Sequence, residues 1–259
     1  MSPLYTPGKV VLRKGWQPMD PDAAAYITAV ETADGQALEE KVKIAIDNFV
    51  LGCKQDGIWS AIKASCILAG ARTLAGALTP LVGTAPTNNN FVAGDYDRET
   101  GLVGDGSTKY LNSNRSNDAD PQDSNHNSLY ITSWSSAVAM GAGLNNTGAN
   151  NINLGSFRCR SASAYSFDVP IFPGFIAFSR SSSSNFTGRV DKTNLEYVSP
   201  SQTSFPRNIL IFARNTAADV PNGQSDARLA FYSIGESLDL ALLDFRVTDL
   251  ITAIGAAIP

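Results

Sequence analysis

Apolar residues follow a helical spacing in two parts of the chain. The first part runs from Gln36 to Cys53, where the spaced residues are Leu38, Val42, Ala45, Ile46, Phe49 and Val50. The second lies near the C-terminus and comprises Leu240, Leu243, Val247, Leu250, Ile251 and Ile254. Steps of three and four place such residues on one face of a helix. The pattern therefore predicts a helix in each part.

Two further helices are predicted beside the first stripe. Asp20 is a good N-cap and Pro21 suits the first helical position, so a helix is expected from there to Gly35, which can end it in a left-handed conformation. A third helix is expected at about 58–68, because Ile58, Ile62 and Cys66 repeat at steps of four. Residues 20–69 would then form a small helical section. Residues 1–19, with the β-rich run "KVVLR" among prolines, are expected to be an extended arm that pairs with something else.

The pattern changes after Gly70. Short β-rich runs alternate with segments rich in Gly, Ser, Asn and Thr, and "NILIFARN" and "RLAFYSIG" are the longest of them. In "SLYITSW" the alternation puts Leu129 and Ile131 on one face of a strand and Tyr130 on the other. Many short strands separated by turns are typical of an antiparallel sandwich. We expect a mainly β, two-sheet antiparallel domain over 70–259, with the C-terminal helix on the sandwich edge.

Composition and charge narrow the possible functions. The chain has 259 residues, 43% of them hydrophobic and 17% charged, and a net charge of −4. A basic face for nucleic acid is therefore not expected. No apolar run reaches the ~18–20 residues of a membrane-spanning helix, and the N-terminus lacks the apolar region of a signal peptide. These features predict synthesis in a cytoplasm and no membrane insertion.

Three carboxylates are the first candidates for catalytic residues. Asp95, Asp97 and Glu99 alternate in "GDYDRETG", so on a strand they would share a face. Glycosidases need two carboxyl groups about 5–10 Å apart. However, glycines flank this segment and Arg98 is available to neutralise one charge. A solvated edge strand is the default interpretation, and we expect no enzyme activity.

No metal site or cofactor is indicated. Cys53, Cys66 and Cys159 match no zinc spacing and are expected to be buried thiols. The acidic cluster and the further loop carboxylates Asp105, Asp118, Asp120 and Asp123 could hold calcium, but no calcium-loop spacing is present.

The chain's only histidine, His126, has no "GxSxG" elbow to accompany it and is interpreted as an exposed or capping loop residue. It belongs to the polar stretch 112–127, which is interpreted as a solvated loop. The alternative is a loop that contacts sugar or another subunit.

Three aromatic residues are candidates for carbohydrate binding. Tyr96, Tyr110 and Trp134 lie near polar segments and could stack on a sugar ring. The alternative is that each is a strand residue of the core.

Several segments together resemble a known module. They are "TLAGALTPLVGTAPT", "NFVAGDYDRETGLVGDGSTKYLNSNR" and "NHNSLYITSW", extended by "GFIAFSR", "NILIFARN" and "RLAFYSIGESL". This sequence resembles the laminin-G-like, or concanavalin A-like, jelly-roll module of bacteriophage virion proteins over about 70–250. The helical section resembles the segment that precedes this module in phage tail-associated proteins. The resemblance implies a jelly-roll sandwich with a structural or host-contact role.

We therefore expect a bacteriophage virion structural protein, tail- or fibre-associated, made in the host bacterial cytoplasm and located in the virion. The arm and helical section would attach it to other virion proteins, as a homo-oligomer. The lectin-like domain would contact a host-surface glycan or serve as an adaptor. A capsid decoration or cement protein and a glycan-degrading virion enzyme are the alternatives.

Overall fold

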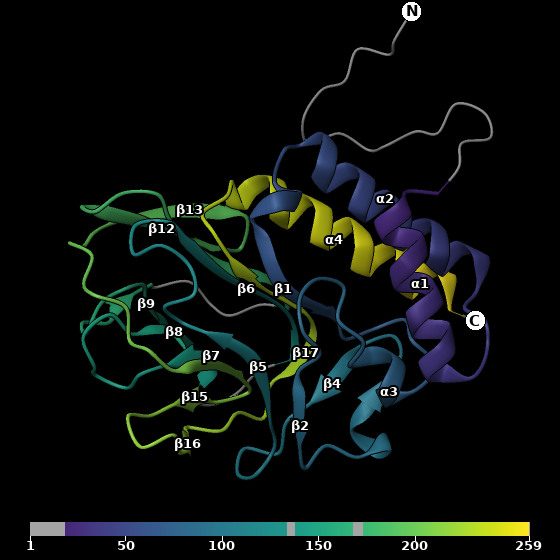
Figure 1. Ribbon diagram of the computed structural model, residues 1–259, viewed down its shortest axis with the longest axis horizontal. Helices are drawn as coiled ribbons and strands as arrows, with labels where there is room; N and C mark the ends of the chain where they lie inside the picture. The colour runs from purple at the N-terminus through teal and green to yellow at the C-terminus, as the bar shows by residue number, and fades with distance from the viewer. Residues whose placement is uncertain (1–18, 134–137, 168–172, 259) are drawn as a thin grey trace, which may run out of the picture.

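The computed structural model describes residues 19–133, 138–167 and 173–258. They form two sheets packed face to face, with a layer of helices on the outer face of one sheet (Figure 1). The predicted fold class, mainly β with a two-sheet antiparallel jelly-roll sandwich, is confirmed. Residues 1–18 of the predicted arm lie outside the described residues.

The first sheet has eight strands in the order β13-β12-β11-β6-β17-β4-β3, with β1 also paired to β17. Their bounds are β1 (Ile62–Ile67), β3 (Tyr96–Asp97), β4 (Gly101–Val103), β6 (Asn125–Ser133), β11 (Gly174–Arg180), β12 (Asn185–Val190), β13 (Thr193–Val198) and β17 (Arg228–Gly235). All pairs in this sheet are antiparallel. One side of β17 pairs with β6, and the other pairs with β4 and then with β1.

The second sheet has nine strands in the order β10-β9-β8-β7-β14-β5-β2, and β15 pairs with both β16 and β7. Their bounds are β2 (Thr87–Asn89), β5 (Tyr110–Ser116), β7 (Val138–Ala142), β8 (Asn150–Asn153), β9 (Ser156–Arg158), β10 (Tyr165–Ser166), β14 (Asn208–Ile211), β15 (Arg214–Asn215) and β16 (Pro221–Asn222). The short β15–β7 contact is parallel and the other pairs are antiparallel.

The main core lies between the two sheets. Leu129 and Ile131 of β6 point into it, together with Met140 and Ile211 of the second sheet. Tyr130 points the opposite way and packs against the helical layer. The two faces predicted for "SLYITSW" are therefore confirmed.

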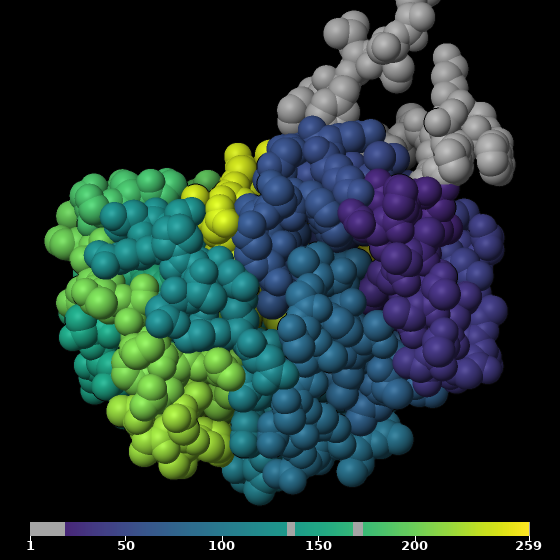
Figure 2. Space-filling model, viewed as in Figure 1, coloured from purple at the N-terminus to yellow at the C-terminus, as the bar shows by residue number. Residues whose placement is uncertain are grey.

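The helical layer consists of α1 (Pro21–Asp34), α2 (Glu40–Gln55) and α4 (Leu240–Ala257), and a short α3 (Leu74–Ala77) lies beside it. The Asp20 side chain accepts a hydrogen bond from the Asp22 amide, and Gly35 ends α1 at a φ of 70°. The apolar stripes of α2 and α4 pack against each other and against Phe175 and Phe231 of the first sheet. The three main helices are confirmed, with α2 beginning at Glu40, but α4 covers the face of the sheet instead of its edge. In Figure 2 the surfaces of α1 and α2 are continuous with the surface of the rest of the molecule.

The third predicted helix, at 58–68, is wrong. A 3-10 turn, η1 (Trp59–Ala61), leads into strand β1. The strand has no solvent-exposed face, because Ala64 and Cys66 point into the sandwich core while Ile67 points toward the helices. Without the polar–apolar alternation of a half-exposed strand, its apolar residues also fitted a helical spacing.

The prediction of a solvated loop over 112–127 is also wrong. Much of the stretch belongs to β5 and β6, and Asn117 and Asp120 are buried between them. The reason is Arg160, which is fully buried and donates hydrogen bonds to the Asn117 side chain (2.7 Å) and the Asp120 carbonyl (3.1 Å). A buried cation needs such partners, so the polar residues are drawn inside.

The three cysteines, Cys53, Cys66 and Cys159, are buried free thiols, as predicted. Burial raises the pKa of the Cys66 thiol to about 12 and that of Cys159 to about 11. In the described part of the chain, no helix combines the length and apolar character needed to cross a membrane.

Candidate functional site

The aromatic residues predicted to bind sugar are divided between the sheets. Tyr96 lies in β3, is partly buried, and donates a hydrogen bond from its hydroxyl to the Ala71 carbonyl at 2.8 Å. Tyr110 begins β5 and pairs with Asn89 of β2. Trp134 lies outside the described residues. Neither described ring lines the cavity reported below, and their part in sugar binding stays a prediction.

The acidic cluster does not form a shared strand face. Asp95 ends a 3-10 turn, η2 (Ala93–Asp95), and forms an ion pair with Lys109 at 2.6 Å. Strand β3 then stops at Asp97, whose carboxylate accepts hydrogen bonds from the amides of Glu99 (3.0 Å) and Thr100 (2.8 Å). The expectation of a common face is therefore wrong, because these bonds fold the segment into a turn.

Arg98, expected to neutralise one of these carboxylates, pairs with Glu39 of the helical layer at 2.7 Å. Asp105, a calcium candidate from the sequence, also stabilises its own turn. Its carboxylate accepts hydrogen bonds from the amides of Ser107 (2.9 Å) and Thr108 (2.8 Å). Among the described residues, no group of three or more His, Cys, Asp or Glu side chains is arranged to hold a metal ion.

His126 is fully buried in β6, so its assignment to an exposed loop is wrong. Its Nδ1 lies 2.6 Å from the Glu236 carbonyl and its Nε2 lies 2.9 Å from the Ser233 hydroxyl. A carbonyl only accepts, so Nδ1–H donates to it and Nε2 accepts from Ser233. Burial lowers the pKa of His126 to about 4. The neutral ring is thus held by two hydrogen bonds in the interior, where no substrate would reach it.

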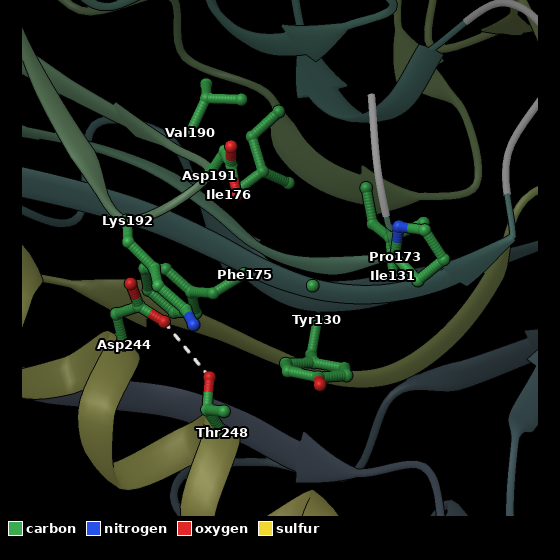
Figure 3. Close-up of a pocket in the computed structure, with 11 residues that line it drawn as sticks. Tyr130, Ile131, Pro173, Phe175, Ile176, Val190, Asp191, Lys192, Asp244 and Thr248 are labelled. Carbon is green, nitrogen blue, oxygen red and sulfur yellow. Dashed lines mark hydrogen bonds between the residues drawn. The ribbon is translucent and has the colours of Figure 1, made fainter. Parts of the chain in front are cut away.

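A cavity of 170 Å³ lies between the outer face of the first sheet and α4 (Figure 3). Its lining comes from four places. These are Tyr130 and Ile131 of β6, Pro173–Ile176 at the start of β11, and Val190–Lys192 at the end of β12, with Asp244 and Thr248 of α4 closing it. At ~30 Å³ for each water molecule in the liquid, this space corresponds to roughly five or six waters. It is large enough for one small ring.

Asp244 is fixed by hydrogen bonds on both oxygens. Oδ2 accepts from Nε of Arg189 at 2.8 Å, and Oδ1 accepts from the hydroxyl of Thr248 at 3.0 Å. Thr248 lies one helical turn after Asp244, so both project from the same face of α4. Arg189 also donates to the Asn194 side chain at 2.7 Å. The β12–β13 hairpin and α4 are therefore joined by a rigid, charge-balanced contact.

Lys192 stands in a strained turn at the cavity. The hairpin between β12 and β13 closes at the Val190–Thr193 pair, leaving Asp191 and Lys192 as its two loop residues. Their φ angles are 46° and 62°. Two-residue hairpin loops of this kind favour Asn-Gly, and a bulky residue at positive φ costs about 1–3 kcal/mol. Among the described residues, the Lys192 ammonium has no ion-pair partner.

The Tyr130 ring lines the cavity, as does the ring-bearing residue Phe175. Figure 3 shows Asp244, Thr248 and Lys192 to one side of this ring and Pro173 to the other. Burial, with a further contribution from the Asp244 charge, raises the pKa of the Tyr130 hydroxyl. The hydroxyl thus remains protonated and can both donate and accept. The cavity combines a ring face with hydrogen-bonding groups of both kinds.

The sequence did not reveal this site. The alternation in "SLYITSW" placed Tyr130 on the face opposite Leu129, and the helical period placed Asp244 and Thr248 one turn apart. Neither signal shows that α4 lies beside Tyr130 of β6, because the two segments are more than a hundred residues apart in the chain. The two positive φ angles at Asp191 and Lys192 have no signature in the residue types.

The sequence matches no protein-family model and no curated protein. Three solved structures illustrate what the fold is similar to. Domains LG4-5 of the mouse laminin alpha1 chain are 14% identical with a TM-score of 0.39, covering 62% of this chain and 47% of that chain. The botulinum neurotoxin serotype D binding domain is 10% identical with a TM-score of 0.44, covering 73% and 50%. The NanB sialidase of Streptococcus pneumoniae is 13% identical with a TM-score of 0.38, covering 53% and 26%.

The chain thus spans between a quarter and a half of the length of these three proteins. Such likeness carries no argument about function. The fold assignment rests on the strand order and packing described above.

Proposed function

We propose that this chain is a bacteriophage virion structural protein, associated with the tail or its fibres, that binds a host-surface glycan and is not an enzyme. The sugar would enter the cavity beside Tyr130. The observation that carries the proposal is the combination, in one cavity, of an aromatic ring with Lys192, Asp244 and Thr248.

The chemistry of this cavity suits a neutral sugar. A sugar ring has an apolar face and a rim of hydroxyl groups, and small-ligand sites usually pair apolar walls with a few fixed polar groups. Tyr130 would contact the apolar face. Around it the carboxylates of Asp191 and Asp244 are balanced by the cations of Lys192 and Arg189. The site therefore offers both donors and acceptors without a strong net charge.

The same contacts argue against glycan cleavage. A glycosidase needs one carboxyl group as an acid and a second as a base or nucleophile. Both oxygens of Asp244 are occupied by Arg189 and Thr248, and Asp191 is exposed. We expect no reducing ends to be released from any glycan that binds, as measured by a reducing-sugar assay. Release that disappears in Asp244→Asn would establish the enzymatic alternative.

A glycan array tests the binding proposal. The whole chain should bind at least one bacterial surface glycan, and Tyr130→Ala should weaken that binding by tenfold or more, as expected for an aromatic anchor. Tyr110→Ala is the matched control, since it removes a tyrosine from the second sheet. Binding that is lost in Tyr110→Ala and kept in Tyr130→Ala would overturn the choice of cavity. A blank array would favour the capsid decoration or cement alternative.

The virion proposal rests on the sequence resemblance of 20–69 and 70–250 to phage tail-associated proteins. Attachment through the N-terminal arm, residues 1–19, and assembly as a homo-oligomer belong to the same proposal. Mass spectrometry of purified particles, from the bacterium or phage whose genome encodes this chain, should detect its peptides in constant ratio to other virion proteins. Their absence from intact particles would overturn this part.

A further inference from the structure

The cavity beside Tyr130 adjoins a second hollow. This second space measures 380 Å³ and runs along the solvent side of α4. Lys192, Asp244 and Thr248 line both spaces, so they form the boundary between them. The two spaces are therefore neighbours, and we refer to them together as the groove.

The groove extends well beyond one sugar unit. From Asp244 it passes Phe245 and continues to Thr252. The eight steps from Asp244 to Thr252 rise by about 12 Å along the helix, at 1.5 Å per residue. The opposite wall comes from Arg189 and Lys192 of the β12–β13 hairpin. The buried Arg189–Asp244 ion pair, at 2.8 Å, joins the two walls where they meet.

The outer hollow also contains an aromatic ring. Phe245 is partly exposed, and the guanidinium of Arg246 lies 5.3 Å from the centre of its ring. Tyr130 lines the inner cavity and Phe245 the outer hollow, with Asp244 common to both. Each space therefore contains an aromatic ring, and charged groups lie between the two spaces. Each space thus offers a sugar unit the same kinds of contact.

We propose that the ligand is a linear oligosaccharide of at least two sugar units, one unit in the Tyr130 cavity and the next against Phe245. This inference rests on the proposed glycan-binding function and defines its ligand as an extended chain. Lys192 stands at the boundary, where it would contact the linkage or the hydroxyls of both units. Asp249 and Thr252 offer polar groups for the outer unit.

A length series tests the inference. The probes are size-fractionated fragments, of one to six sugar units, of the glycan that the whole chain binds on the array. Affinity measured by calorimetry should rise at least tenfold from the monosaccharide to the trisaccharide. Phe245→Ala should remove most of that gain and leave the affinity for the monosaccharide unchanged.

Two further variants are needed to interpret the result. Phe245→Leu keeps the apolar volume and removes the ring, so it should show the same loss even if Phe245→Ala is unstable. Leu154→Ala removes an apolar side chain that is 43% exposed in the turn between β8 and β9, and this variant should bind every length as the original chain does. Equal affinity for one and three units, or no effect of either Phe245 variant, would overturn the inference while glycan binding stands. Failure to bind any glycan would overturn the proposed function and this inference together.

Discussion

At the scale of single residues, His126 shows how burial controls a charge. The folded chain holds the ring neutral, with a pKa of about 4, against 6.5 for an exposed histidine. Desolvation is the main cause, and the hydrogen bond to the Glu236 carbonyl only partly offsets it. The folded state therefore resists protonation that the unfolded chain accepts.

This difference predicts a pH-dependent stability. Below the unfolded pKa the unfolded chain binds a proton that the folded chain does not, so stability is lost as the pH falls toward the folded pKa. Between pH 7 and pH 5 the loss from this one group should be roughly 2 kcal/mol. Urea unfolding at a series of pH values would measure it. In His126→Gln the loss over this range should nearly vanish, although the variant is less stable at pH 7. An unchanged slope would contradict the assignment.

Lys192 illustrates a residue whose backbone conformation works against stability. Lys192→Gly should leave the free energy of unfolding unchanged or raise it by up to about 1 kcal/mol, because glycine adopts a φ of 62° without strain. Lys192→Met should keep the strain and lose only the charge. Both variants should bind the glycan several-fold more weakly. A Lys192→Gly variant that binds as well as the original chain would show that the lysine has no role in the site.

At the scale of elements, two glycines in the helical layer have opposite roles. At Gly52 of α2, an added Cβ would lie 2.7 Å from Nε of Arg246, which is buried and paired with Asp56 at 2.7 Å. At Gly255 of α4, nothing lies within 4 Å of an added Cβ. Gly52→Ala should therefore lower the free energy of unfolding by about 1–3 kcal/mol, and Gly255→Ala should raise it by about 0.5–1 kcal/mol. Denaturant unfolding of the two variants is the measurement, and a stabilised Gly52→Ala would contradict the packing of α2 on α4.

The elements also show which parts of the fold can be predicted from sequence patterns. Helices α2 and α4 were predictable because each has one apolar and one polar face. Strand β1 was not predictable, because helices cover one of its faces and the sandwich core covers the other. The stretch 112–127 was wrongly predicted to be solvated because its residues are polar. Some of them are buried instead, since they accept hydrogen bonds from Arg160, which is distant in sequence. The candidate site was equally hidden, because its residues meet only when α4 packs on β6 and β11.

At the scale of the whole molecule, the helical layer and the sandwich share their apolar surfaces. Phe175 of β11 and Phe231 of β17 pack under α2 and α4. Strand β1, which follows the helices in the chain, completes the pairing of β17. The section expected to attach the protein to a particle is thus also part of its core.

This sharing predicts a single cooperative unfolding unit. A chain that begins at Gly70 would lack α1, α2 and β1, leaving Phe175 and Phe231 without the cover of α2, at a cost of up to about 1.5–3 kcal/mol each, and β17 partly unpaired. Such a chain should not fold, whereas the full chain should unfold in one transition. In native-state hydrogen exchange, amides of α2 and β17 should open with the same free energy. If the chain from Gly70 folds with native-like stability, or α2 exchanges well before β17, the helices are an appendage and the sandwich is stable without them.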